Sequence, residues 1–530
     1  MKYIYKLFII FSLLLMSGCD YDLNINTDPN TPQEASCDLR LPNILSMTAD
    51  VYGSHGMRTS LLIQQTGFIY SVGNRNYDLQ NWKFSNSAEV YIWQSWYIYI
   101  WINIRKMIED ANAKGAWHYV GVGKAIEAFG CSFIADAYGI MAYKDGLSNE
   151  TFMPTYDDAS TVYEQILPLC DEAIDYLSRE QSAAAPALSK ADTYYKGDTQ
   201  KWIKFVYGLK ARLLSHMTKK PVGTQFGNYN PDAILSLIDK SFTSSADDAE
   251  MKYIKGSKVS VEQSINFQNV SFSNKPGKLF TQYLLNTVPG TGNSWNSGIE
   301  DPRAEKMIPK IETGSMKGKY SLGVDLEFTD SKPIAKDSTY FGLAISDKTA
   351  PSGKRGTTAF TQDDYAYAIL SYYELMFIKA ETYFRKGDKA NALKFYKDAI
   401  AAHMGKLKVD ATKAQNFLNS AAVAQTAGEL TLSHIMIQKY IALVINPEAW
   451  TDMRRCDFCL DASGNYSETE GVYKGFKRPK FAYEQNFGTK GYPRRYQMAY
   501  MERDYNAANV RPWGVFELDY MTYPVWWDKK

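Results

Sequence analysis

Apolar residues recur at three- and four-residue steps along much of the chain, which is the period of an amphipathic helix. The clearest run lies between Ala88 and Ala113, with apolar positions at Val90, Trp93, Tyr97, Ile100, Trp101, Ile104 and Ile108. The same period predicts helices at about 117–138, 160–178, 199–217, 231–241, 363–386, 388–402, 430–445 and 447–456. Alternation with a period of two is scarce, so the pattern predicts a mainly α fold.

One segment, residues 371–400, has the spacing of a tetratricopeptide repeat. Ala380 and Ala392 are small enough for two antiparallel helices to pack closely, and Tyr383 and Tyr396 are expected to fill the groove between them. Weaker forms of the pattern occur at 163–174 and 202–213. Because one such unit cannot bury its own apolar face, the sequence predicts a scaffold of stacked helix pairs. Generic amphipathic helix pairs are the alternative.

Two regions lack the helical period. Residues 243–360 are rich in Ser, Gly, Asn, Thr and Lys, and residues 461–530 are rich in Tyr, Gly and Pro. We therefore predict one domain over 44–530, with helical scaffold at about 88–242 and 361–456 and loop-rich regions elsewhere. A rigid scaffold fixes the ends of such loops while their side chains stay free to reach a ligand, so binding is expected on the loops.

The N-terminus carries an export signal. Two lysines precede a ten-residue apolar run, residues 7–16, which is too short to span a bilayer. Met-Ser-Gly then leads into Cys19, as in a bacterial lipobox, although an ordinary secretory signal with an incidental cysteine is the alternative. We predict a signal peptide at 1–18, acylation of Cys19, and a polar lipid-anchored tether at 19–43.

Composition narrows the choice of partner. Lys and Arg total 59 against 58 for Asp and Glu, so no global field favours nucleic acid. Aromatic residues make up 14% of the chain, and some are expected on surfaces that bind a flat, partly apolar ligand. Beyond Cys19 the cysteines are odd in number, so no disulfide framework is implied. Cys456 and Cys459 have C-x-x-C spacing, for which a local disulfide or two ordinary thiols are both favoured over a metal.

Nothing in the sequence indicates catalysis. The motifs of zinc proteases, serine hydrolases and phosphate-binding loops are absent, and the five histidines have no metal-ligand spacing. We predict no enzyme activity, no metal and no cofactor. A glycosidase with two carboxylates is not excluded by motif, because such a pair is close in space rather than in sequence. A pure protein–protein scaffold is a third class that the same fold could serve.

The ordered combination of lipobox, polar tail, helix pairs, long insertion and Tyr- and Arg-rich C-terminus resembles the SusD/RagB family of outer-membrane nutrient-binding lipoproteins. The stretches most similar to that family are 24–30, 133–143, 438–443, 448–455 and 492–496. Ile140 and Ala142 depart from its usual motif. The resemblance implies an outer-membrane lipoprotein facing the cell exterior. Such a protein binds oligosaccharides and serves as the lid of a SusC-like TonB-dependent transporter. RagB-like oligopeptide uptake with the same partnership is the alternative.

Two loops combine aromatic planes with polar side chains, which is how proteins hold sugar rings. The candidate ligand-binding residues are Asn74, Arg75, Tyr77, Asp78, Asn81 and Trp82 in the first loop and Asn293, Trp295 and Asn296 in the second. For both tryptophans the alternative is a ring that packs its loop onto the scaffold. Three other tryptophans, Trp93, Trp96 and Trp101, lie at helical spacing and are expected in the core. The same loop residues could hold a peptide instead.

Overall fold

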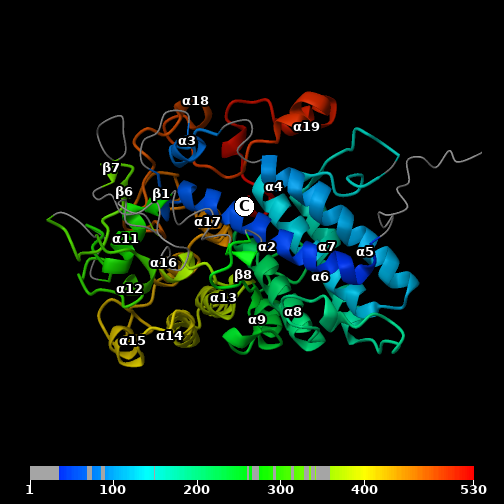
Figure 1. Cartoon of the computed structure of the whole chain (residues 1–530). Helices are drawn as coiled ribbons and strands as arrows, with labels where there is room; N and C mark the ends of the chain where they lie inside the picture. The colour runs from blue at the N-terminus through cyan, green and yellow to red at the C-terminus, as the bar shows by residue number, and fades with distance from the viewer. Residues whose placement is uncertain are drawn as a thin grey trace, which may run out of the picture.

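The computed structural model describes residues 35–68, 74–84, 90–148, 150–259, 262–264, 274–290, 294–311, 315–327, 334–335, 341 and 358–530. Helices dominate this part of the chain, and its strands form short antiparallel two-stranded pairings. Figure 1 shows the long helices of the N-terminal half on the right and the short helices and loops of the insertion on the left. The predicted mainly α fold is confirmed.

The first half of the scaffold is built from long helices. Its elements are α2 (Cys37–Leu62), α3 (Arg75–Gln80), α4 (Val90–Ser95), the π-helical η1 (Trp96–Trp101), α5 (Ile102–Ala113), α6 (Trp117–Tyr138), α7 (Ala159–Ser178), α8 (Thr199–Ser215), the 3₁₀ turn η3 (His216–Lys219) and α9 (Pro231–Asp239). The helix predicted at 117–138 is α6, and Trp93, Trp96 and Trp101 are buried as expected. The ring of Trp96 lies so close to the backbone of Gly130 on α6 that a Cβ there would clash with it.

The second half contains the predicted repeat. Its helices are α13 (Tyr372–Arg385), α14 (Lys389–Lys406), α15 (Ala411–Leu418), α16 (Leu432–Ala442) and α17 (Glu448–Arg455). Ala380 and Ala392 are fully buried where α13 packs on α14, and so is Tyr396. Tyr383 stacks on Phe395 with ring centroids 5.5 Å apart. The tetratricopeptide-like pairing is confirmed.

Two boundaries differ from the prediction. The tether was expected to reach residue 43, but α2 begins at Cys37, whose N–H donates to Asp110 Oδ2 on α5 at 2.8 Å. Leu41 and Ile44 are already fully buried there. The helix predicted from 363 is a strand first, because Tyr367–Leu370 (β8) pairs with Ala249–Met251 (β4) before α13 starts. Both features depend on contacts distant in sequence.

The remaining described regions are loop-rich, as predicted. The insertion holds α11 (Lys278–Leu285), α12 (Ala304–Met307), β5 (Lys275–Pro276), β6 (Val324–Asp325) and β7 (Ile334–Ala335), and β5 pairs with β1 (Thr66–Gly67). A further pairing joins β2 (Ile140–Met141) to β3 (Asp157–Asp158). The C-terminal region holds α18 (Glu484–Phe487), α19 (Tyr500–Tyr505), α20 (Ala507–Val510) and the 3₁₀ turns η8 (Arg511–Trp513), η9 (Tyr520–Thr522) and η10 (Trp526–Asp528).

Buried ion pairs tie the scaffold helices together. Arg212 on α8 and Glu374 on α13 are both buried, with Nη2 and Oε2 2.6 Å apart. Arg455 on α17 pairs with Glu381 on α13 and with Asp452. Removing one partner of such a pair leaves an uncompensated buried charge, so these contacts fix which helices pack together.

The five cysteines of the described chain are free thiols. Cys456 and Cys459 are both buried, and burial raises the pKa of each to about 11. Of the two alternatives left open by the C-x-x-C spacing, the structure therefore has two ordinary thiols. Cys19, the signal peptide and the first part of the tether lie outside the described residues. None of the described helices combines the length and the apolar composition that a membrane span requires.

Candidate ligand site

The first predicted loop is a short capped helix. Asn74 Oδ1 accepts hydrogen bonds from the backbone N–H of Asn76 at 2.9 Å and of Tyr77 at 3.3 Å, which starts α3. Asn74 therefore serves the turn itself. Arg75 is exposed and Tyr77 is half-buried.

The end of α3 is closed by the same kind of local contact. Asn81 is buried, its Nδ2 donates to the Tyr77 carbonyl at 3.0 Å, and its own carbonyl accepts from the Tyr483 N–H at 3.1 Å. Asp78 is half-buried and pairs with Lys83 at 3.6 Å. Of this loop, Arg75, Tyr77 and Asp78 have side chains placed to reach solvent.

Trp82 is not the exposed plane that the sequence analysis expected. Its side chain is 0% exposed, and Nε1 donates to the Leu62 carbonyl at 3.1 Å. The ring packs against Phe487 and Tyr492 at centroid distances of 5.7 and 5.3 Å, and the Arg478 guanidinium lies 5.3 Å from it. The alternative therefore holds for Trp82, whose ring packs its loop onto the scaffold.

A hollow of about 410 Å³ opens next to Trp82, and we call it the tyrosine pocket. It is lined by Glu327, Tyr466, Lys477, Arg478, Lys480 and Tyr492. Two of these residues, Arg478 and Tyr492, are the ones that cover the Trp82 ring. Trp82 thus lies directly behind the lining. The combination of aromatic and polar side chains that was predicted for its loop is formed instead by the residues that line the pocket.

The side chains of the tyrosine pocket suit a polar ligand with a flat face. Tyr466 is 37% exposed, and Lys477 Nζ lies 5.5 Å from its ring. Burial, as the largest cause, raises the pKa of Tyr466 and raises that of Tyr492 to about 12, so both phenols stay protonated. The Tyr466 hydroxyl donates to Glu468 Oε1 at 3.3 Å and can accept from a ligand. Lys477 Nζ is 3.4 Å from Glu327 Oε1. Sequence reasoning missed these residues, although the density of Tyr, Lys and Arg after residue 465 was a usable signal.

The second predicted loop is divided. Asn293 lies outside the described residues, and Asn296 is exposed. Trp295 is 6% exposed and packs on His434 of α16 at a ring distance of 4.7 Å. Ser294 Oγ also contacts His434 Nε2 at 2.9 Å. Trp295 therefore anchors its loop on the scaffold, and Asn296 is the described residue of this predicted set whose side chain is open to solvent.

A second hollow, of about 480 Å³, lies beside this loop and includes Gly298. Tyr320 and Lys310 line it, with the lysine Nζ 5.1 Å from the tyrosine ring. It offers one partly buried ring and mixed charges. The two hollows share no lining residue.

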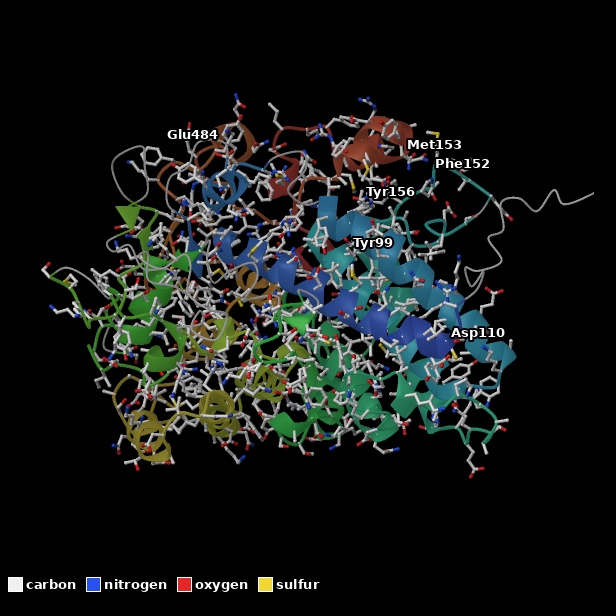
Figure 2. All side chains as sticks on the ribbon, viewed as in Figure 1. Tyr99, Asp110, Phe152, Met153, Tyr156 and Glu484 are labelled. Atoms are coloured by element: carbon white, nitrogen blue, oxygen red, sulfur yellow. The ribbon has the colours of Figure 1, made fainter. Side chains whose placement is uncertain are left out.

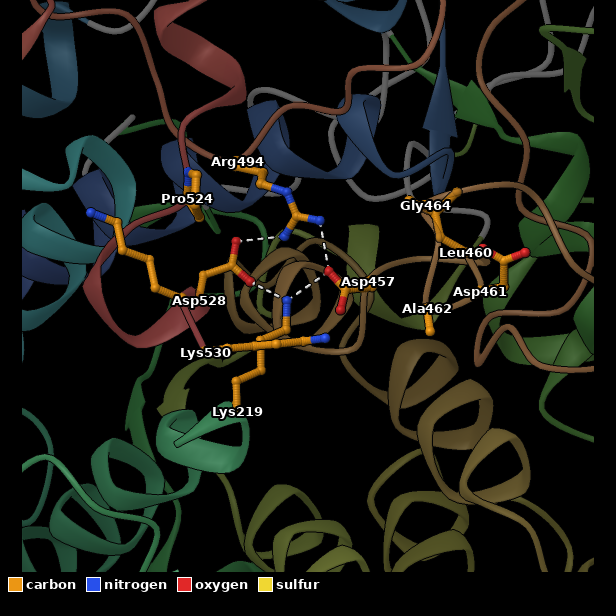
Figure 3. Close-up of a pocket in the computed structure, with 11 residues that line it drawn as sticks. Lys219, Asp457, Leu460, Asp461, Ala462, Gly464, Arg494, Pro524, Asp528 and Lys530 are labelled. Carbon is orange, nitrogen blue, oxygen red and sulfur yellow. Dashed lines mark hydrogen bonds and ion pairs between the residues drawn. The ribbon is translucent and has the colours of Figure 1, made fainter. Parts of the chain in front are cut away.

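The hollow shown in Figure 3 has a different character. At its centre four alternating charges form a closed ring. Lys219 Nζ lies 2.6 Å from Asp457 and 2.7 Å from Asp528, and Arg494 lies 2.7 and 2.6 Å from the same two carboxylates. These groups satisfy one another and seat the C-terminal residues, so we assign the ring a structural role.

A buried cluster of Asp136, His216 and Glu448 brings together groups that can ligate a metal. In the structure protein groups fill its hydrogen bonds. His216 Nε2 is 3.0 Å from Glu448 Oε2, the Tyr163 hydroxyl is 2.8 Å from His216 Nδ1, and Trp527 Nε1 donates to Asp136 at 2.5 Å. The cluster joins α6, α7, α17 and the C-terminal turn η10 (Trp526–Asp528).

One edge of the molecule carries exposed apolar side chains, which we call the apolar band. Its members are Phe152, Met153, Tyr500, Tyr505, Phe516 and Leu518. Figure 2 shows Phe152 and Met153 on the edge where α19 lies, and Glu484 of α18 further along that edge. Hydrogen bonds from Asn509 to the Met153 carbonyl and from Asn486 to the Leu518 carbonyl connect the segments.

Comparison with known proteins gives a consistent result. A SusD-like family model described as "Starch-binding associating with outer membrane" matches residues 29–472. Comparison with curated proteins finds no significant match. Among solved structures, a SusD/RagB family protein from Bacteroides thetaiotaomicron is 21% identical, with a TM-score of 0.64 and coverage of 93% of this chain and 99% of that one.

Two further structures are similar over almost the whole chain. A SusD homolog from Bacteroides fragilis is 19% identical, with a TM-score of 0.65 and coverage of 94% of this chain and 100% of that one. A chitin-binding protein is 18% identical, with a TM-score of 0.62 and coverage of 93% and 100%. At these identities the likeness establishes the fold.

Proposed function

Because this chain belongs to the SusD-like family, which associates with the outer membrane and binds nutrient glycans, we propose that it captures oligosaccharides at the cell surface. It passes them to a SusC-like TonB-dependent outer-membrane transporter, to which it serves as the lid. The observation that carries the glycan part is the tyrosine pocket, with an exposed ring beside hydrogen-bonding side chains. Sugars present C–H faces flanked by hydroxyls and match that combination.

The apolar band supports the transporter part of the proposal. Tyr505 is 78% exposed and Phe152 is fully exposed. Large exposed apolar surface on a monomer commonly marks a protein interface. Glu484 of α18 lies further along the same edge as Phe152 and Met153 (Figure 2), and the Tyr483 N–H just before α18 donates to the Asn81 carbonyl next to Trp82. A partner on the band would therefore lie near the tyrosine pocket, where it could receive ligand.

Anchoring at the outer membrane, facing the exterior, is proposed to depend on acylated Cys19, which lies outside the described residues. Replacing Cys19 with Ala should abolish lipid labelling and membrane attachment. Continued membrane fractionation of a labelled Cys19→Ala chain would contradict this part.

We propose binding without catalysis. Among the described residues, one carboxylate, Glu327, lines the tyrosine pocket, and the neighbouring Glu468 accepts a hydrogen bond from the Tyr466 hydroxyl at 3.3 Å. Glycoside hydrolysis commonly needs two carboxyl groups that face the same glycosidic bond. Oligopeptide capture remains the alternative, since Lys477, Arg478 and Lys480 could pair with peptide carboxylates. Binding to a panel of polysaccharides and peptides decides between glycan capture and oligopeptide capture.

The test is affinity electrophoresis and calorimetry of the soluble chain, starting after Cys19, against a panel of polysaccharides and peptide mixtures. We expect retardation by one glycan class, lost in Tyr466→Ala and kept in Tyr505→Ala, a matched exposed tyrosine on the apolar band. Heat from peptides alone, with no glycan bound, would replace the glycan proposal with peptide capture.

The partnership has its own experiment. A tagged chain carrying Phe152→Asp and Tyr505→Asp should no longer co-purify a TonB-dependent transporter from detergent-solubilised outer membranes, with the transporter identified by mass spectrometry. Tyr466→Ala should still do so. Equal recovery with the doubly substituted chain would remove the apolar band from the interface.

A further inference from the structure

We propose that the tyrosine pocket selects acidic oligosaccharides, meaning chains that carry carboxylate or sulfate groups, over neutral ones. This inference rests on the proposed glycan function and specifies the class of glycan. It starts from the lining itself, whose described residues are three cations, one carboxylate and two tyrosines.

The charge is concentrated in one segment of a chain that is otherwise balanced. Residues 474–496 contain seven Lys and Arg residues and a single acid, Glu484, whereas the whole chain has a formal net charge of +1. Arg494 and Arg495 are bound elsewhere, in the charged ring and against the carbonyls of Tyr523 and Pro524. The cations that reach the pocket are Lys477, Arg478 and Lys480. The carboxylates beside them are Glu327 in the lining and Glu468, which accepts from the Tyr466 hydroxyl at 3.3 Å, so cations still exceed carboxylates by one among the described residues.

Arg478 is held as a fixed donor. Nη1 donates to the Gly491 carbonyl, and Nη2 donates to the Gly488 carbonyl at 2.7 Å. These two bonds use two of the five guanidinium N–H groups, which leaves others to meet a ligand. The guanidinium also lies against Trp82 and Tyr492. A planar donor held in place in this way is well suited to carboxylate or sulfate.

The two lysines are available to a ligand. The Lys480 backbone N–H donates to the Leu326 carbonyl at 2.8 Å, which fixes this residue beside Glu327. No described residue forms a hydrogen bond or ion pair with its ammonium group. Lys477 pairs with Glu327, but both side chains are more than a third exposed. Exposed pairs of this kind are weak, so an incoming anion can replace Glu327 as the partner of Lys477.

The test uses the soluble chain and three polymers, namely polygalacturonate for carboxylate, dextran sulfate for sulfate, and amylose as a neutral glycan. We expect an acidic polymer to bind at least about tenfold more tightly than amylose, because one hydrogen bond to a charged group increases affinity by about that factor. The double variant Lys477→Ala/Lys480→Ala should lose about tenfold or more of that affinity. Raising NaCl from about 50 mM to about 500 mM should also weaken it, because screening is stronger.

Two variants separate local contact from overall charge. Lys490→Ala removes an exposed lysine of the same segment that does not line the pocket and should leave the affinity for acidic polymers unchanged. Glu327→Gln removes the competing carboxylate and should strengthen binding. An equal loss in Lys490→Ala would show that the effect is non-specific and would overturn the proposal.

The outcomes also separate this inference from the proposed function. Amylose bound as tightly as the acidic polymers, with no effect of salt, would overturn the acidic preference while leaving glycan capture intact. Polyglutamate bound more tightly than either acidic glycan would overturn it in favour of acidic peptides. Binding of no polymer in any arm would overturn the glycan function itself.

Discussion

The helix-pair scaffold and the tyrosine pocket contain the same kinds of group in opposite environments. In the scaffold the Arg212–Glu374 pair is almost completely excluded from water, whereas Lys477 and Glu327 in the pocket are 47% and 37% exposed. The aromatic rings differ in the same way, with Trp82 buried and Tyr466 open to solvent. Burial, more than residue type, therefore separates groups that hold the fold from groups that can meet a ligand.

The largest expected effect is on the free energy of unfolding, when the buried Trp82 ring is removed. Trp82→Ala should lower the free energy of unfolding by about 3–5 kcal/mol, because it leaves a cavity between α2 and the 476–492 segment. Tyr466→Ala should change it by less than about 1 kcal/mol. Urea denaturation of the soluble chain measures both. Similar losses of unfolding free energy in the two variants would show that burial does not separate the role of Trp82 from that of Tyr466.

The ion pairs provide the next contrast. Glu374→Gln should cost about 3 kcal/mol of unfolding free energy, because Arg212 is left buried without a counter-charge. Glu327→Gln should cost less than about 1 kcal/mol. A small loss for Glu374→Gln in the same denaturation experiment would show that the α8–α13 contact does not depend on charge.

A smaller, pH-dependent change in the free energy of unfolding should come from His434, which holds the second loop. Burial lowers the pKa of His434, which packs on Trp295, to about 4 from its ordinary 6.5. Between these values the unfolded chain binds more protons than the folded one, so stability is lost as the pH falls. Lowering the pH from 6.5 to 5 should cost about 2 kcal/mol through this residue. His434→Gln should show a correspondingly flatter pH profile; an unchanged slope would contradict the assignment.

The scaffold could be predicted from sequence because the helical period is local. The helix at 117–138 is correct to the residue, and the α13–α14 pair follows from small residues at fixed spacing. The start of α2 and the strand before α13 could not be found this way. They depend on contacts of Cys37 with Asp110 and of β8 with β4.

The sequence predicted the approximate region of the ligand site but not the residues that line it. The loop at 74–82 does lie beside the tyrosine pocket, but burial of Trp82 is decided by Leu62, Phe487 and Tyr492, and the last two are some four hundred residues away in sequence. Residue type and local spacing carry no information about that contact. The contact between Tyr466 and Lys477 likewise could not be predicted from the sequence, because it depends on how the fold places the two side chains.

A crystal structure of the soluble chain with the oligosaccharide that the binding panel identifies would locate the ligand directly. We expect a sugar ring against Tyr466, with acidic or hydroxyl groups within hydrogen-bond distance of Arg478 and Lys480. A sugar bound away from the tyrosine pocket, whether in the hollow beside Tyr320 or at the charged ring of Lys219, would contradict this expectation.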